Sequence, residues 1–217
     1  MPLRQLFPTL RLLLLLTLPA LAAAQAPRPK VSKRDELVTI TTSAGVIRLI
    51  LFSDTPLHRG NFLARAKAGR YDGTTFHRVI PGFMVQGGDP NSLDNDPNND
   101  GQGPANEPML AAEIRPGHSH ALGAVAAART ADFMNPQRQS SVSQFYLVEN
   151  RQGAHQLDGQ YTVFGQVIQG LDVLEKIAAL PRDARDRPLT DLKMTVTVQK
   201  LKKKKISQLY GYTYPAS

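Results

Sequence analysis

Short β-rich runs separated by turn residues recur between Leu37 and Leu201, and this pattern restricts the fold more than any other feature. Leu37–Thr41 and Val46–Phe52 flank Ser43-Ala44-Gly45 and predict a hairpin. The further runs are Phe76–Ile80, Phe83–Gln86, Ala121–Ala128, Gln144–Val148, Tyr161–Val167 and Met194–Leu201. Many short strands with few helices predict a mostly β domain, a closed antiparallel barrel capped by helices.

Two segments carry helical signals. Asp54 or Thr55 can cap a helix that has Pro56 in its first turn and runs to about Ala68. The second helix, Leu171–Leu180, is ended by Pro181. Helical spacing predicts that these side chains face the core: Leu57, Phe62 and Ala66 in the first helix, and Leu171, Leu174 and Ile177 in the second.

The first 24 residues are typical of a secretory signal peptide. Arg4 and Arg11 precede an apolar run, Leu12–Leu21, and Ala22-Ala23-Ala24 offers a cleavage site before Gln25. A membrane anchor is the alternative, but the run is shorter than the ~18 residues of a spanning helix. The sequence therefore predicts an exported protein, periplasmic or secreted, with no stable membrane insertion after cleavage.

The remaining chain divides by composition. Residues 25–35 contain Pro27 and Pro29 and read as a linker, residues 36–201 as the folded domain, and residues 202–217 as a basic and aromatic tail. The chain has no cysteine, so neither a disulfide nor an acylated cysteine can stabilise or anchor it. Much of the formal net charge of +8 lies in Lys200 and Lys202–Lys205, which are expected to be solvated; contact with anionic headgroups or polyanions is the alternative.

The stretch from Phe76 to Asp89 sets an arginine beside apolar residues. Arg78 precedes a Pro81-Gly82 turn, and Phe83 and Met84 follow it. Period-two alternation would send Phe76, Arg78 and Ile80 to one face of the hairpin. Charged residues are normally solvated unless they are paired or functional. The stretch alone fits either a working arginine or an ordinary hairpin whose arginine reaches water.

Three separated segments together resemble the cyclophilin-type peptidyl-prolyl isomerases, in that family's order and spacing. They are Phe76-His77-Arg78-Val79-Ile80-Pro81-Gly82-Phe83-Met84-Val85-Gln86-Gly87-Gly88-Asp89, Ser143-Gln144-Phe145-Tyr146, and Leu157-Asp158-Gly159-Gln160-Tyr161-Thr162-Val163-Phe164-Gly165. The similarity runs from about Leu37 to Leu201. It implies an eight-stranded β-barrel, two capping helices, no cofactor and no metal.

The resemblance also implies roles for individual residues. The residues matching the family's catalytic positions are Arg78, Phe83, Gln86, Tyr146 and Tyr161. Those matching its substrate-binding positions are Met84, Ala128, Arg129, Gln144, Phe145 and Leu157. The implied partners are proline-containing peptides and unfolded polypeptides, with no nucleic acid, and the protein is expected to be a monomer. A non-catalytic proline-peptide binding module or holdase is the alternative function.

Two residues depart from the family pattern at the rim of the groove. Gln156 stands where tryptophan is frequent, and Arg129 stands where asparagine is usual. Gln156 should weaken binding of the family's cyclic peptide inhibitor, and Arg129 should shift the peptide preference toward acidic neighbours. Tyr146 replaces the usual phenylalanine and adds a hydroxyl group.

Two metal-like patterns also occur. Asp96 to Glu107 matches the EF-hand calcium loop, as a calcium-dependent scaffold would require, but no flanking helix is evident and a plain polar loop is favoured. His118 and His120 could ligate a metal, but no third ligand lies nearby in sequence. His77 is expected to be a structural histidine, hydrogen-bonded within the barrel.

Overall fold

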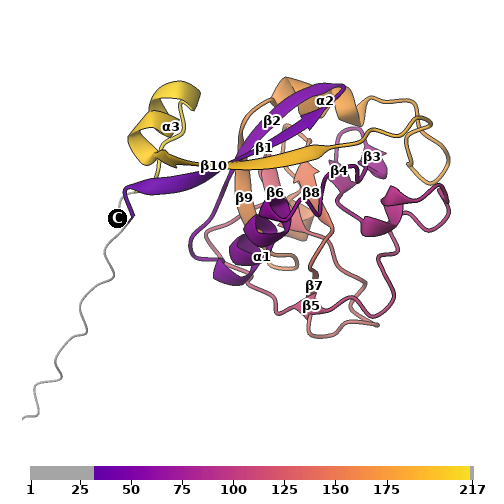
Figure 1. Cartoon of the computed structure of the whole chain (residues 1–217). Coiled ribbons are helices and arrows are strands. Elements are labelled where there is room, and N and C mark those ends of the chain that lie inside the picture. The colour runs from indigo at the N-terminus through magenta and orange to yellow at the C-terminus, as the bar shows by residue number, and fades with distance from the viewer. Residues whose placement is uncertain (1–31, 216–217) are drawn as a thin grey trace, which may run out of the picture. The chain divides into compact units, whose positions relative to one another are not determined.

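The computed structural model describes residues 32–215 of the chain. The predicted signal peptide, its cleavage site and most of the predicted linker lie outside the described residues. Figure 1 shows the described part as a strongly curved sheet with helices against it. Within residues 32–215, no helix is both long and apolar enough to cross a membrane.

One antiparallel sheet contains eight of the strands (Figure 1). In sheet order they are β10 (Thr195–Lys202), β1 (Arg34–Thr42), β2 (Gly45–Leu51), β9 (Val163–Gln169), β6 (Ala124–Ala127), β8 (Phe145–Val148), β4 (Met84–Gly87) and β3 (Arg78–Ile80). The short strands β5 (Met109–Leu110) and β7 (Ser140–Ser141) form a separate pair. The predicted β1–β2 hairpin is confirmed, with Thr42 opposite Gly45.

The predicted closed barrel is wrong, because the described sheet has two edges, β10 and β3. Near these edges, the segment before β10 contacts β3 and the residues that precede it: the Val79 amide donates to the Asp186 carbonyl at 2.8 Å. Thr75 and Lys193 form an isolated bridge, and the Phe76 amide donates to the Leu192 carbonyl at 3.0 Å. Strand β3 has only three residues, and among the described residues no ladder joins it to β10.

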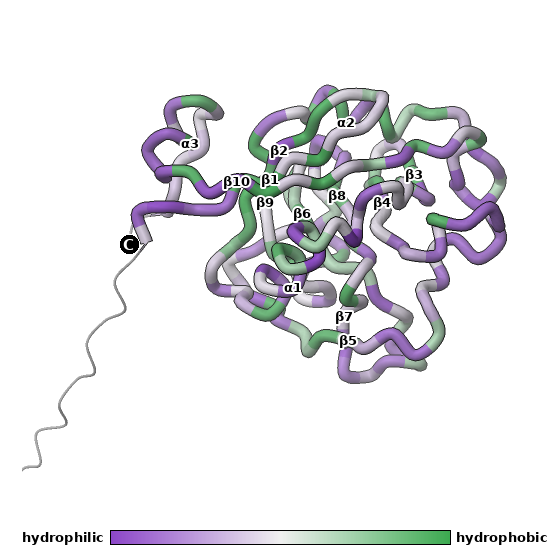
Figure 2. The backbone as a smooth tube through the Cα atoms, viewed as in Figure 1, coloured by the Kyte–Doolittle hydropathy of each residue, from purple (hydrophilic) through white to green (hydrophobic). Residues whose placement is uncertain are grey.

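Each face of the sheet carries an apolar cluster, which explains the continuous apolar runs in β6 and β8. Phe145 and Leu147 of β8 face the main core, whereas Tyr146 and Val148 face a second cluster on the other side. The main core stacks aromatic rings, with Phe62 4.8 Å from Tyr71 and 5.3 Å from Phe145 between ring centroids. Figure 2 shows hydrophobic residues concentrated in the strands and hydrophilic residues in the surrounding loops.

The first helix, α1 (Pro56–Lys67), begins after Thr55 as predicted, but one of its predicted core residues is wrong. Phe62 and Ala66 are buried, whereas Leu57 is 50% exposed. The buried stripe begins at His58, four residues before Phe62. Its Nδ1 lies 2.7 Å from an oxygen of Glu113, so a polar pair occupies the position expected to be apolar.

The second helix, α2 (Leu171–Ala178), buries Leu174 and Ile177 as predicted. The loop after β4 contains a short 3₁₀ turn, η1 (Pro90–Leu93), and a second such turn, η2 (His155–Leu157), precedes β9. Buried Asp89 orders the first of these loops, because its carboxylate accepts hydrogen bonds from the amides of Asn91 and Gly103, each at 3.0 Å.

A third helix, α3 (Lys203–Tyr210), forms in the segment expected to be a solvated tail. Its Ile206 is fully buried against Leu37 of β1 and Ile50 of β2. Tyr212 and Tyr214 follow the helix and pack at the edge of the same cluster. Lys204 and Lys205 remain exposed, so the helix is amphipathic: its isoleucine anchors it while the lysines stay in water.

Candidate active site

The β3–β4 hairpin brings Arg78 and Gln86 together. The turn is Ile80-Pro81-Gly82-Phe83, closed by the Phe83 amide donating to the Ile80 carbonyl at 3.1 Å. Gly82 has φ of +71°, which the third position of a type II turn requires and few other residues adopt. The resulting register sets Arg78 directly opposite Gln86.

Phe76 does not lie on the arginine's face as alternation predicted. Strand β3 starts at Arg78, so the alternation does not extend back to Phe76, and Phe76 and Val79 both pack in the main core. Arg78 is exposed on the other face, and Ile80 packs against the second cluster.

A pocket of about 160 Å³ opens beside Arg78. It contains nine of the eleven predicted site residues: Arg78, Phe83, Met84, Gln86, Ala128, Arg129, Tyr146, Leu157 and Tyr161. Met84 and Tyr146 are buried and form its base, whereas Phe83, Leu157 and Tyr161 are partly exposed at its sides. The walls are therefore apolar, and a guanidinium lies at their edge.

Arg78 has no ion-pair partner among the carboxylates of residues 32–215. Its five N–H donors are therefore not committed to a neighbouring acid. A guanidinium is never deprotonated in proteins, so this group is a permanent donor at the pocket edge.

Arg129 is committed to the protein itself. Its guanidinium lies 2.6 Å from Asp132, donates to the Gln160 carbonyl at 3.0 Å, and stacks 4.2 Å from the ring centre of Tyr161. Ion pairing with Arg129 and Arg138 lowers the pKa of Asp132. Arg129 thus holds the Tyr161 wall in place, and it is paired with a carboxylate that it shares with Arg138, which reduces the attraction for acidic peptides expected from it.

A buried hydrogen-bond chain supports the base of the pocket. The Tyr146 hydroxyl lies 2.9 Å from His120 Nε2, and His120 Nδ1 lies 2.8 Å from Asp158. Burial lowers the pKa of His120, so the ring is neutral and donates from Nδ1 to Asp158 while Nε2 accepts from Tyr146. The extra hydroxyl of Tyr146 therefore has a structural partner.

Replacing Tyr146 with phenylalanine should cost about 1–2 kcal/mol of unfolding free energy, because it leaves Nε2 of the fully buried His120 without a partner. The ring that lines the pocket remains, so the activity that the family resemblance implies should stay within about twofold. Denaturant unfolding and a peptide assay of the variant measure both quantities. A large loss of activity with unchanged stability would contradict this structural role.

Stability should also fall in mild acid. The pKa of His120 is lowered by burial, so the unfolded chain binds its proton more readily than the folded chain. This contribution is complete above the unfolded value of 6.5 and is lost as the pH falls through the folded pKa. The stability difference between wild type and His120→Gln should therefore narrow as the pH falls below the unfolded pKa of 6.5. A constant difference would show that His120 does not titrate in this way.

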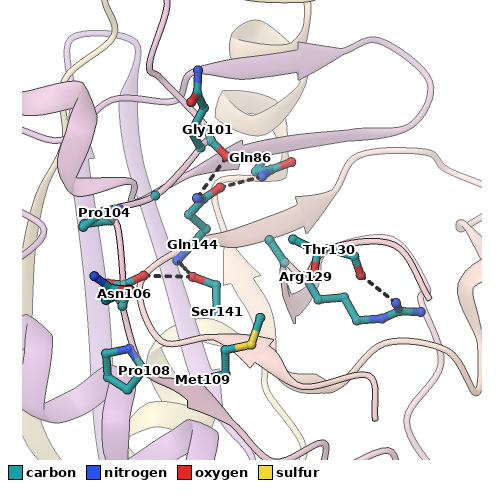
Figure 3. Close-up of a pocket in the computed structure, with 14 residues that line it drawn as sticks. Gln86, Gly101, Pro104, Asn106, Pro108, Met109, Arg129, Thr130, Ser141 and Gln144 are labelled. Atoms are coloured by element: carbon teal, nitrogen blue, oxygen red, sulfur yellow. Dashed lines mark hydrogen bonds between the residues drawn. The ribbon is translucent and has the colours of Figure 1, made fainter. Parts of the chain in front are cut away.

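Figure 3 shows a larger pocket, of about 240 Å³. It shares Gln86, Ala128 and Arg129 with the first pocket. Gln144 lines this second pocket. It accepts from Gln86 Nε2 at 2.9 Å and donates to the Gly101 carbonyl at 3.1 Å. The polar loop after β4 supplies much of the rim, from Gly101 to Met109. Motif matching missed these loop residues, since only the folded chain brings them to β8.

Phe145 is the predicted site residue that the structure does not bring to either pocket. Its side chain is 1% exposed and packs in the main core. The neighbours of Phe145 along β8 point the other way, as the alternation of a strand requires.

The expectation for His77 is partly wrong. The ring is buried, as expected, but neither of its nitrogens has a hydrogen-bond partner among the described residues.

The geometry does not support calcium binding by the EF-hand-like loop. Asp96 accepts from the amide of Asn98, Asp100 pairs with Arg187 at 2.7 Å, and Glu107 accepts from Ser143. Each carboxylate thus serves a different neighbour. In the part of the chain that the structure describes, no three potential ligands come together for a metal ion.

The histidine pair is separated in the same manner. His118 stacks on Phe52 and pairs with Asp54, while His120 points inward to Tyr146.

Fold and site together define a β-sheet domain with an apolar-walled pocket of about 160 Å³ beside a guanidinium that has no ion-pair partner in residues 32–215. The family model described as cyclophilin type peptidyl-prolyl cis-trans isomerase/CLD matches residues 37–199. The chain belongs to the cyclophilin-type peptidyl-prolyl cis-trans isomerase family, which confirms the predicted enzyme class.

Curated relatives agree. The peptidyl-prolyl cis-trans isomerase CYP18-1 of Arabidopsis thaliana is 36% identical over 72% of this chain and 91% of its own length. The peptidyl-prolyl cis-trans isomerase-like 2 of Rhizopus delemar is also 36% identical, over 75% of this chain, but this chain spans only 28% of that relative.

Solved structures share the fold. A cyclophilin type peptidyl-prolyl cis-trans isomerase of Cryptosporidium parvum, solved in the presence of the dipeptide Ala-Pro, has a TM-score of 0.65 and 28% identity, covering 75% of this chain and 98% of its own. Cyclophilin AquaCyp293 of Hirschia baltica has a TM-score of 0.57 and 22% identity, covering 80% and 76%. The latter likeness supports the fold alone.

Proposed function

We propose that this chain catalyses cis-trans isomerisation of X-Pro bonds in exported proteins, with Arg78 as its catalytic group. The observation that carries the proposal is the uncommitted guanidinium of Arg78 at the edge of the apolar pocket. Family membership and the Ala-Pro dipeptide named for the Cryptosporidium parvum structure support it.

The chemistry required is modest. Resonance gives the X-Pro bond a rotation barrier of ~18–20 kcal/mol, and uncatalysed exchange takes tens to hundreds of seconds. When the amide twists, the prolyl nitrogen regains a lone pair and can accept a hydrogen bond. Arg78 donates to that nitrogen, and because the donor is needed only in the twisted state, the interaction lowers the barrier. No bond to the substrate forms or breaks.

The other pocket residues hold the substrate around that twist. Phe83, Met84, Tyr146 and Leu157 enclose the proline ring, which keeps one side of the rotating bond fixed. Gln86 lies opposite Arg78 in the hairpin and is oriented by Gln144, so its amide is preorganised to bind the peptide backbone.

A coupled isomerisation assay with an X-Pro peptide tests the activity and separates it from a holdase. The proposal predicts that the protein accelerates isomerisation of the peptide, and that the rate saturates as the peptide concentration rises. A holdase would instead only keep unfolded proteins from aggregating. Peptide binding without acceleration would favour the non-catalytic binding module instead.

Export is a second part of the proposal and rests on Arg4, Arg11, the apolar run Leu12–Leu21 and the small residues before Gln25. We propose a periplasmic or secreted location and cleavage before Gln25. Mass spectrometry of the protein from a cell-envelope extract should find Gln25 at its amino terminus. An intact Met1 in the cytosolic fraction would contradict export and leave the proposed activity untouched.

A further inference from the structure

A third hollow, rich in arginine, adjoins the pocket beside Arg78, which we call the proline pocket. Its volume is about 380 Å³, and it shares Arg78, Gln86 and Arg129 with the proline pocket. The loop Pro97–Gln102 lines it on one side, and Arg185 and Arg187 from the turn before β10 line it on another. A peptide held with its proline beside Arg78 therefore has its neighbouring residues within reach of this hollow.

Four arginines line the hollow, but two of them are occupied. Arg187 pairs with Asp100 and Asp191, each at 2.7 Å, and Arg129 pairs with Asp132. Among the described residues that line the hollow, Asp100 is the only acid, and its side chain is just 5% exposed in its pair with Arg187. The lining therefore carries an excess of positive charge.

Apart from Arg78, the proposed catalytic group, Arg185 is the arginine that supplies this excess positive charge. Its nearest carboxylate, Asp183, is 3.8 Å away, and its side chain is 60% exposed. It donates to the Asn98 side-chain oxygen at 3.3 Å, a contact that points it across the loop but neutralises no charge. An incoming carboxylate can pair with this guanidinium without displacing a buried ion pair.

His77 provides a second, independent sign of a ligand at this place. It lines the hollow and is 5% exposed, yet neither ring nitrogen has a partner within residues 32–215. Gly101 packs directly against the ring: a Cβ there would lie 3.3 Å from Nε2. A buried polar ring without a partner is unfavourable, and an acceptor entering the hollow would relieve that cost.

We propose that this hollow, which we call the acid subsite, binds the carboxylate of an aspartate or glutamate near the substrate proline, with Arg185 as its specificity-determining residue. The proposal rests on the proposed function, because the substrate must already be seated beside Arg78. One incompletely paired arginine matches the single charge of a carboxylate.

The test compares four X-Pro peptides that carry a single Glu or its isostere Gln, either just before or just after the X-Pro pair. In the wild-type protein, Glu on one side should tighten binding and raise kcat/KM about fivefold over Gln. In Arg185→Gln that advantage should fall to about one. Arg185→Glu should reverse the charge preference, so that a fifth peptide with Lys at the same position binds more tightly than the Glu peptide.

Arg34→Gln is the matched control. Arg34 is exposed at the start of β1, a strand at the opposite end of the sheet order from β4 and β3, and its replacement removes the same charge. The Glu advantage should persist in this variant. Equal binding of Glu and Gln peptides by the wild type, or an advantage that survives in Arg185→Gln, would overturn the acid subsite. Dissociation constants are measured directly, so the binding comparison tests the acid subsite even if no peptide is isomerised. Absence of isomerisation would count against the proposed function alone.

Discussion

Arg78→Ala should lower kcat/KM for an X-Pro peptide by about 100-fold or more while the fold remains intact. Removing one preorganised donor from a transition state typically costs that much. Arg78 is exposed and has no ion-pair partner in the described chain, so its truncation exposes no cavity and leaves no buried charge unpaired. A coupled assay and the thermal midpoint of the variant measure the two effects.

Arg78→Lys is the informative control for that result. Lysine keeps the charge but lacks the planar fork of donors, so most of the activity should still be lost. If the lysine variant is fully active, the charge alone suffices and a directed hydrogen bond is not required. If Arg78→Ala itself keeps a wild-type rate, the proposed mechanism is wrong.

Ile206→Ala should lower the unfolding free energy by about 2–4 kcal/mol. Ile206 is fully buried where α3 meets Leu37 and Ile50, so its truncation leaves a cavity beneath the helix. Leu209 lies on the same helix but is 56% exposed. Leu209→Ala should therefore change stability by only about 0.5 kcal/mol. Denaturant melts of the two variants provide the comparison.

Equal effects of these two substitutions would contradict the packing of α3. If both were neutral, the segment after β10 would behave as the solvated tail that its lysines suggest. A loss of unfolding free energy in Ile206→Ala alone would instead show that the carboxyl-terminal segment is part of the folded domain.

Much of the fold could be predicted because local patterns agree with it. Thr55 and Pro56 mark the start of α1, and Ser43-Ala44-Gly45 marks the β1–β2 turn. Leu57 could not be placed, because whether the helix's buried stripe passes through residue 57 or 58 depends on Glu113, far away in the chain. That the sheet is open could not be predicted either, because closure depends on hydrogen bonds between the two edge strands and not on any local sequence pattern.

α3 was missed for a related reason. Lys202–Lys205 reads as a solvated run, and a single Ile206 gives little periodic signal. Burial of Ile206 against Leu37 and Ile50 is decided by tertiary contact, which local propensity does not report.

The site was more predictable than its surroundings, because the motifs lie on the strands that form it. Tyr146 faces the pocket and Phe145 faces the core, a difference that strict alternation along β8 could have revealed. The chain from Tyr146 through His120 to Asp158 joins three distant segments, so spacing gave no sign of it. The acid subsite likewise depends on the turn around Arg185 folding against the loop at Gly101.

The most direct test of the central claim is the exchange rate of a bound X-Pro peptide, measured by two-dimensional exchange NMR for wild type and Arg78→Ala. The same spectra give the affinity, so binding and catalysis are separated in one sample. We predict that the variant binds the peptide within a few-fold of wild type but interconverts its cis and trans forms about 100-fold more slowly. An unchanged exchange rate on the bound peptide would contradict the account.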